Sequence, residues 1–146
     1  MEGPVTETIV FADDVSVALK VGPDIADITT ELNRIVAASG VQTGVLTANM
    51  VGSTGSLTTI EYEPGVVEDL KRAMERMAPR GMAYEHEKAW HDGNGHSHVQ
   101  AALMGAGIAV AVRSGNLALG TWQQVVAVNH DNRARRRTVA VTVVGR

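Results

Sequence analysis

The chain has 146 residues, a formal net charge of −3 and no cysteine. Its length suits one domain over residues 1–146, and its hydrophobic fraction of 45% suits an ordinary globular core. The missing cysteines exclude disulfides and thiolate metal sites, and the lack of a basic excess argues against a nucleic-acid partner. With no signal peptide and no apolar run near the ~20 residues that span a bilayer, we expect a cytoplasmic protein without membrane association.

Two strands and a helix are predicted at the start of the chain. Alternating apolar and polar residues predict strands over Thr6–Phe11 and Val15–Val21, and Asp13-Asp14 between them predicts a hairpin turn. Asp24 is a candidate N-cap for a helix that Gly40 ends. The apolar stripe of that helix comprises Ile25, Ile28, Leu32, Ile35 and Val36.

Strands and helices then follow without regular β-α-β alternation. A helix should begin near Pro64 and end at Pro79, and a shorter one should cover about His96 to Leu103 after a long polar loop. The predicted strands are Gly44–Val51, Leu57–Tyr62, Ile108–Arg113, Gln123–Asn129 and Arg137–Val144. This order favours the α+β class, with mixed or antiparallel sheets and helices on their outer faces.

Histidines gather in the second half of the chain. His86, His91, His96 and His98 lie in a short window that also holds acidic residues. Imidazole and carboxylate groups are the ligands that zinc uses when cysteine is absent, but solvated loop histidines are an equally good interpretation for His86 and His91. A helix would place His98 among small residues, which fits either a ligand pocket or close packing against a strand.

Two further segments carry polar groups beside apolar strands. Thr121, Trp122 and Gln123 form a corner that either lines a site or plugs the core. Glu61 lies in a β-like run and is either a ligand or general base, or an ordinary edge glutamate.

Arginines form the strongest run of charge. The run comprises Arg133, Arg135, Arg136 and Arg137, which suits a solvated face or a site where guanidinium groups bind phosphate. The glycine-rich turn over residues 52–56 could present backbone N–H groups to an anion, although it lacks the ending of a P-loop.

Taken together, these segments resemble the YjbQ-like family, also described as secondary thiamine-phosphate synthases. The resemblance covers nearly the whole chain and is most specific from Asp92 to Arg137, which includes the histidine segment Asp92–His98, Leu117–Gln123 and the arginine run. It implies a compact YjbQ-like α+β sandwich, commonly a homotrimer with a polar cleft at a subunit boundary. It also implies a weak thiamine-phosphate-forming activity, which joins a pyrimidine pyrophosphate to a thiazole phosphate and releases pyrophosphate.

The resemblance assigns roles to the candidate residues. The catalytic candidates are His98, Glu61 and His96. The candidates for binding a phosphorylated heterocyclic metabolite are Thr121, Trp122, Gln123, Arg135, Arg137 and Asn94. A divalent ion, zinc or magnesium, would be held by His98, His86 and Glu61.

Two departures from the family pattern support an alternative function. The family has a histidine step in the turn where this chain has Gly52-Ser53-Thr54, and an asparagine where it has Ile60. Losing one ligand changes what a small metal site can hold. The alternative to a transferase of the thiamine-phosphate synthase type is therefore a diverged, non-catalytic oligomeric module that binds a metabolite or metal.

Overall fold

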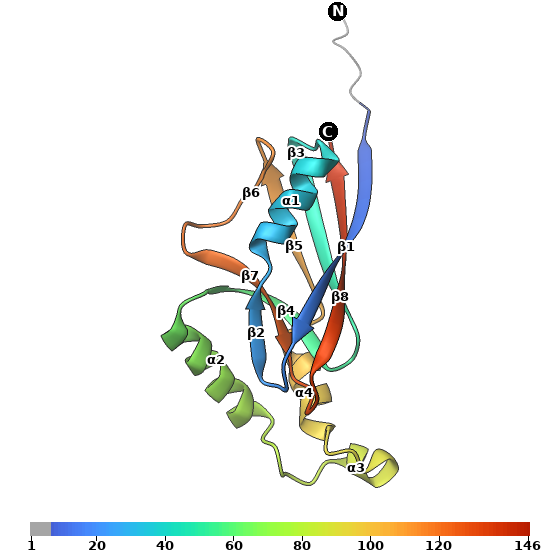
Figure 1. The fold of residues 1–146 in the computed structure, drawn as a ribbon, viewed down its shortest axis with the longest axis vertical. Coiled ribbons are helices and arrows are strands. Elements are labelled where there is room, and N and C mark those ends of the chain that lie inside the picture. Colours follow the sequence, from blue (N-terminus) through green and yellow to red (C-terminus); the bar gives the residue numbers. More distant parts are fainter. Residues whose placement is uncertain (1–6) are drawn as a thin grey trace, which may run out of the picture.

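A computed structural model describes residues 7–146 as two antiparallel sheets with helices packed against them (Figure 1). The larger, five-stranded sheet has the order β1 (Ile9–Leu19), β8 (Arg135–Gly145), β3 (Thr43–Val51), β5 (Gly107–Arg113) and β6 (Asn116–Leu117). The smaller, three-stranded sheet has the order β2 (Asp24–Asp27), β7 (Gln123–Asn129) and β4 (Gly55–Glu61). The helices are α1 (Thr29–Ser39), α2 (Pro64–Met77), α3 (Glu85–Trp90) and α4 (Gly95–Met104).

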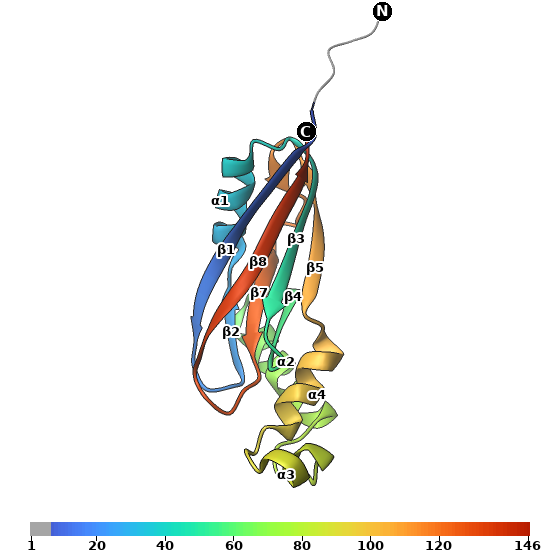
Figure 2. The ribbon, with the colours of Figure 1, turned by 90° about the vertical axis from the view of Figure 1, so that its right-hand side faces the viewer.

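The main core lies between the inner faces of the two sheets and α1. Branched aliphatic side chains from β1, β3 and β8 meet Leu32 and Val36 of α1 and Leu57 of β4, all nearly or fully buried. Each fully buried aliphatic side chain contributes roughly 2 kcal/mol through the hydrophobic effect. The long strands β1, β8, β3 and β5 of the larger sheet lie side by side (Figure 2).

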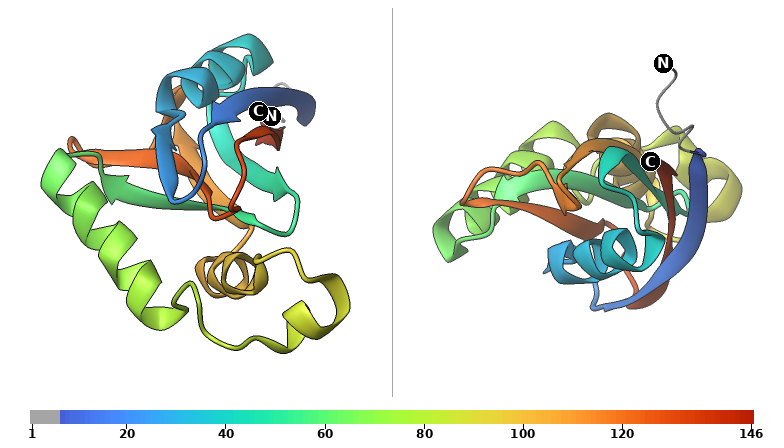
Figure 3. Two further views of the ribbon diagram at one scale, coloured as in Figure 1. Left: turned by 60° about the horizontal axis from the view of Figure 1, so that its bottom comes forward. Right: turned by 90° about the horizontal axis from the view of Figure 1, so that it is seen from above.

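A second, smaller core lies on the other face of the small sheet. Val126 and Val128 of β7 point to it, together with Ile25 of β2 and Met74 of α2. Because β7 is covered on both faces, its residues from Val125 onward are all buried. The helix α2 runs along this outer side, and α3 and α4 lie at one end of the molecule (Figure 3).

The predicted N-terminal hairpin is wrong over the described residues. A single 11-residue strand, β1, pairs with β8 from Ile9↔Gly145 to Leu19↔Arg135, and Asp13 pairs with Val141 inside it. An edge strand tolerates exposed carboxylates, so the two aspartates do not enforce a turn. Thr6, where the first predicted strand begins, lies outside the described residues.

The predicted start of the first helix is also wrong. Asp24 and Ile25 belong to strand β2, which pairs with β7, and α1 begins only at Thr29. The Asp27 carboxylate accepts a hydrogen bond from Thr29 N–H at 2.9 Å and so supports the helix start. The predicted end at Gly40 is confirmed, because this residue has the left-handed φ of 73° that favours glycine.

The other predicted elements are confirmed to within two residues at their ends. The α+β class, with antiparallel sheets and helices outside them, is also confirmed. Besides β2, two short elements were not predicted: α3 lies within the expected polar loop, and β6 has only two residues. Both are too short to show a periodic pattern.

The strand register brings several chain segments to one end of the small sheet. Gly55, the first residue of β4, pairs with Asn129, the last residue of β7. The chain leaves β7 through a loop at Asp131 and enters β8 at Arg135. The first turn of α4 reaches the same loop, because Asn94 bonds to Asp131. These four segments form the candidate site.

Candidate functional site

A polar cleft of about 400 Å³ lies where these segments meet. Its walls are the turn before β4, the segment around the start of α4, and the start of β8. The lining residues are Val51, Gly52, Ser53, Thr54, Asp92, Asn94, His98, Asp131, Arg135, Arg136 and Arg137. The structure therefore brings four of the predicted residues together: His98, Asn94, Arg135 and Arg137.

Asp131 connects all three walls of the polar cleft, although it is only 1% exposed. Its Oδ1 accepts from Asn94 Nδ2 at 3.1 Å and Arg133 N–H at 2.9 Å. Its Oδ2 accepts from Thr54 Oγ1 at 2.9 Å and Arg135 Nε at 3.1 Å. Burial raises the pKa of Asp131, but the hydrogen bonds outweigh it and the pKa lies below its usual value. The carboxylate is therefore ionised, and its lone pairs are engaged.

Thr54 links this carboxylate to Arg137. Arg137 Nη2 donates to Thr54 Oγ1 at 2.5 Å and to Asn129 Oδ1 at 2.7 Å. Because the Thr54 hydroxyl accepts from the guanidinium, its own hydrogen is free to donate to Asp131. The turn before β4 is thus fixed to the start of β8 through charged hydrogen bonds, which are stronger than neutral ones.

Arg137 is packed beneath the glycine-rich turn and is 7% exposed. A side chain at Gly52 would place its Cβ 2.8 Å from Arg137 Nη1, and one at Gly55 would lie 3.2 Å from its Nε. That Nε is buried and has no hydrogen-bond partner among the described residues. Burial lowers the pKa of Arg137, but guanidinium stays charged at physiological pH.

The α3–α4 segment supplies the histidine side of the polar cleft. The His86 and His98 rings lie 4.5 Å apart between centroids at an interplanar angle of 50°, and His86 also stacks on the exposed Trp90. His86 Nε2 lies 3.3 Å from Asp92 Oδ1. The Glu87 carboxylate holds the loop by accepting from Gly93 N–H at 2.8 Å and Gly95 N–H at 3.0 Å.

His96 and His130 are buried behind the cleft rather than lining it. His96 is 5% exposed, and burial together with the Arg80 charge lowers its pKa. Burial lowers the pKa of His130 to about 4, with Arg137 adding to the effect. Both imidazoles are therefore neutral at physiological pH.

His130 has a hydrogen-bond arrangement like that of a serine nucleophile and its base. Its Nε2 lies 2.7 Å from Ser56 Oγ, and its Nδ1 lies 2.9 Å from Gln100 Oε1. Gln100 Nε2 donates to the carbonyls of Ala78 and Met74, so its Oε1 must accept and His130 carries its proton on Nδ1. Ser56 is fully buried, however, so this trio stabilises the core and does not reach a substrate.

Glu61 and the corner formed by Thr121, Trp122 and Gln123 lie at the opposite end of the small sheet. Glu61 pairs with Gln123, and Gly55 pairs with Asn129, six residues along each strand. At about 3.3 Å per residue, this separation is roughly 20 Å. Within one chain, Glu61, Thr121, Trp122 and Gln123 are therefore not brought to the polar cleft, and all four are exposed.

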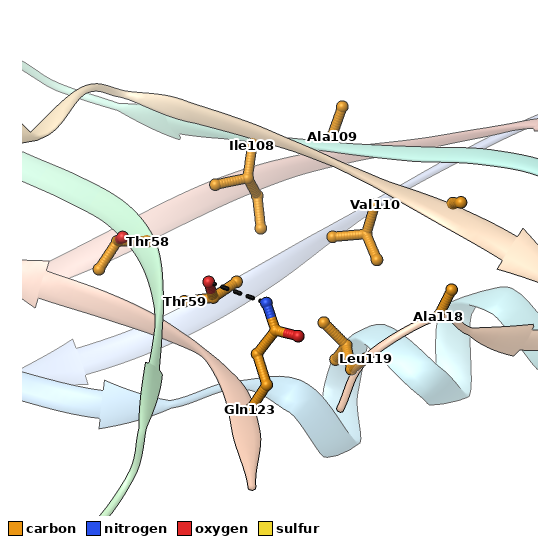
Figure 4. A pocket seen from close by; sticks show the side chains of 9 residues that line it. Thr58, Thr59, Ile108, Ala109, Val110, Ala118, Leu119 and Gln123 are labelled. Atoms are coloured by element: carbon orange, nitrogen blue, oxygen red, sulfur yellow. Dashed lines mark hydrogen bonds between the residues drawn. The ribbon is translucent and has the colours of Figure 1, made fainter. Parts of the chain in front are cut away.

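Gln123 instead lines a different cavity of about 340 Å³ between β4 and β5 (Figure 4). Its Nε2 donates to Thr59 Oγ1 at 3.1 Å, and the remaining walls are mainly aliphatic. Trp122 is 73% exposed, so it does not plug the core.

The predicted metal ligands do not converge within the described chain. His86 and His98 are adjacent, but Glu61 lies at the far end of β4. Over residues 7–146, no group of three or more histidines and carboxylates is arranged to hold a metal ion. Three protein ligands are the usual minimum for zinc, so the predicted set does not fit one.

The protein is thus an α+β protein of two antiparallel sheets, with an arginine-lined polar cleft at one end. The chain belongs to the UPF0047 family of YjbQ-like proteins, because the family model described as UPF0047 protein YjbQ-like matches residues 13–146. The resemblance expected from the sequence is therefore confirmed.

Relatives and solved structures agree with this assignment. A UPF0047 protein of Archaeoglobus fulgidus is 34% identical over 116 residues, which cover 80% of this chain and 88% of the relative. UPF0047 protein YjbQ of Salmonella typhimurium is 31% identical over 120 residues, covering 81% and 86%. The crystal structure of a YbjQ-like protein of unknown function from Sulfolobus solfataricus matches with a TM-score of 0.91 at 28% identity, covering 96% of this chain and all of that one.

No helix within residues 7–146 is long and apolar enough to cross a membrane.

Proposed function

We propose that the polar cleft binds a phosphorylated small molecule. The observation that carries this proposal is the group of three arginines in one cleft, with Arg135 held by Asp131 through Nε. That contact leaves the Nη1 and Nη2 groups of Arg135 available. Guanidinium groups recognise phosphate through such paired N–H donors.

A neighbouring hollow supports a ring-bearing ligand. It has a volume of about 390 Å³, shares Gly52, Ser53 and His98 with the polar cleft, and continues over small residues of α4 and of the connection between α4 and β5. A phosphorylated heterocycle could place its phosphate at the arginines and its flat ring over Ala101 and Ala102. Burial of that ring would add hydrophobic stabilisation to the ionic contacts.

The enzymatic form of the proposal is a transferase of the thiamine-phosphate synthase type. His98 would act as general acid or base, because its half-buried ring lines both the cleft and the hollow. A divalent ion would need a phosphate oxygen of the ligand beside the two histidines. The alternative is a non-catalytic metabolite-binding module, which the distance between Glu61 and the cleft favours.

We also propose a homotrimer. The exposed Trp122 supports it, since aromatic side chains are enriched at interfaces. A second subunit could also bring the Glu61 end of one chain to the polar cleft of another. Light scattering after size-exclusion chromatography gives the oligomeric state, and a monomer would contradict this proposal.

Calorimetric titration tests the binding proposal. Inorganic phosphate and phosphorylated pyrimidines or thiazoles should bind the wild-type protein, and Arg135→Ala should weaken binding about tenfold or more. Arg113→Ala removes an exposed arginine at the other end of the large sheet and is the matched control. Equal losses from both variants, or no binding by the wild type, would contradict a phosphate site in the cleft.

A further inference from the structure

We propose that the polar cleft recognises a second charge on its ligand: a protonated amine, a short spacer away from the phosphate, that lies against Asp92. This inference rests on the proposed phosphate site and adds the chemical class of ligand that the site prefers, an aminoalkyl phosphate or a phosphate ester with a similarly placed ammonium group.

The side chains of the cleft carry charges of both signs. The start of β8 contributes Arg135, Arg136 and Arg137, whereas the segment before α4 contributes Asp92. A ligand with a single anionic group would satisfy the arginines but would not use the free oxygen of Asp92.

Asp92 retains an unused acceptor. Its Oδ1 accepts from Asn94 N–H at 3.1 Å and lies near His86 Nε2, while Oδ2 has no partner among residues 7–146. The Asp92 side chain is 37% exposed and lines the polar cleft. Partial burial raises the pKa of Asp92, but the Asn94 N–H and His86 lower it by more. The pKa therefore lies below its usual value, and the group is ionised at neutral pH.

An ammonium group fits this position better than a hydroxyl or a second phosphate. Ammonium offers three N–H donors and no acceptor, and a carboxylate is an acceptor only. A second phosphate would be repelled by Asp92, and a hydroxyl would gain no ionic attraction. The His98 ring, which lines the same cleft, offers a nitrogen acceptor for a further hydrogen bond from the amine.

The net charge of the cleft side chains also favours a ligand that carries an amine. The three arginines of the cleft exceed its two carboxylates, Asp92 and Asp131, by one. A doubly charged phosphate ester would therefore leave the cleft with an excess negative charge. The same ester with a protonated amine carries one net negative charge and neutralises the cleft.

Matched ligands test the inference by calorimetry in the presence of a chelator, which removes metal ions as an alternative cation. Aminoalkyl phosphates with two, three and four carbons are compared with alkyl phosphates in which a methyl group replaces the ammonium. At one spacer length, the amine should bind about fivefold tighter, the advantage of a partly exposed ion pair. Equal affinity at every length overturns the inference but leaves the phosphate site intact.

Asp92→Asn supplies the second test. The amide oxygen can still accept from Asn94 N–H, and the variant no longer repels the phosphate. Asp92→Asn should therefore bind the alkyl phosphate at least as tightly as the wild type and lose the preference for the amine. Asp69→Asn, at an exposed carboxylate of α2, should keep the preference. An amine preference that persists in Asp92→Asn overturns the inference. If neither ester binds the wild type, the proposed phosphate site fails and the inference fails with it.

Discussion

Asn94 and Asp131 are 37 residues apart in sequence, and their side chains are joined in the folded chain by a hydrogen bond of 3.1 Å. This bond connects the start of α4 to the loop between β7 and β8. The Asn94 oxygen also accepts from Asn132 N–H at 3.1 Å, so both ends of its amide hold the same loop. The geometry of the polar cleft therefore depends on a buried, ionised carboxylate and one amide.

Replacing Asp131 by alanine should destabilise the fold by about 3 kcal/mol, because it removes four hydrogen bonds and leaves buried donors without partners. Urea unfolding measures the change. Asp131→Asn should lose less, since the amide retains one accepting oxygen. An effect of Asp131→Ala no larger than that of the exposed control Asp69→Ala would contradict the assigned role.

Acid should destabilise the protein through His130. Its pKa of about 4 in the fold lies below the usual 6.5, so the unfolded chain binds the proton more readily. The stabilisation is complete above about pH 6.5 and is lost as pH falls towards 4, by on the order of 3 kcal/mol. Unfolding measured from pH 7 to pH 4 checks this.

His130→Gln is the comparison for that pH series. The variant should be less stable at pH 7, because Ser56 and Gln100 lose the hydrogen bonds that His130 makes with both. Its free energy of unfolding should nevertheless fall less steeply with acid. Identical pH slopes for the wild type and the variant would show that His130 is not the group responsible.

Gly52→Ala should disturb Arg137. Gly52 has a φ of 134°, which favours glycine, and a Cβ there would lie 2.8 Å from Arg137 Nη1. Arg137 would have to shift, which would weaken its hydrogen bonds to Thr54 and Asn129. This should lower the free energy of unfolding by about 1 kcal/mol beyond the cost of the backbone strain. Phosphate affinity should fall as well.

Gly40→Ala is the matched control for the glycine experiment. It also places alanine at a positive φ, 73°, but its Cβ has nothing within 4 Å. Thermal unfolding and phosphate titration of the two variants separate backbone strain from the displacement of Arg137. Equal losses of stability and affinity in both would contradict the predicted contact.

Glu87→Ala should loosen the loop between α3 and α4. The carboxylate accepts from Gly93 and Gly95 N–H, so both amides should exchange with deuterium several-fold faster in the variant. Glu85→Ala, which removes only an exposed ion pair with Lys88 inside α3, should leave these rates unchanged. Unchanged exchange in Glu87→Ala would rule out this carboxylate as the tether.

The sequence predicted most elements because their patterns are local. The two errors near the N-terminus have one physical cause: Asp13 and Asp24 favour turns and helix caps, but pairing with β8 and β7 places both in strands. Long-range pairing of this kind leaves no signal in a short window of sequence.

The candidate site was predicted only in part for a related reason. His98, Asn94, Arg135 and Arg137 carry recognisable charge or motif signals and do line the polar cleft. Asp131 and Thr54 were missed as site residues, although an acidic residue two positions after a buried strand and just before an arginine run was a usable signal. Glu61 and Gln123 are indeed neighbours, but strand register places them at the other end of the sheet.

A crystal structure of the protein with a bound phosphate ester would show whether the polar cleft is a phosphate site. Phosphate oxygens should lie within hydrogen-bond distance of the Arg135 guanidinium, which Asp131 holds through Nε. Phosphate bound only elsewhere, for example in the cavity beside Gln123, or a cleft that stays free of ligand at saturating concentration, would contradict it.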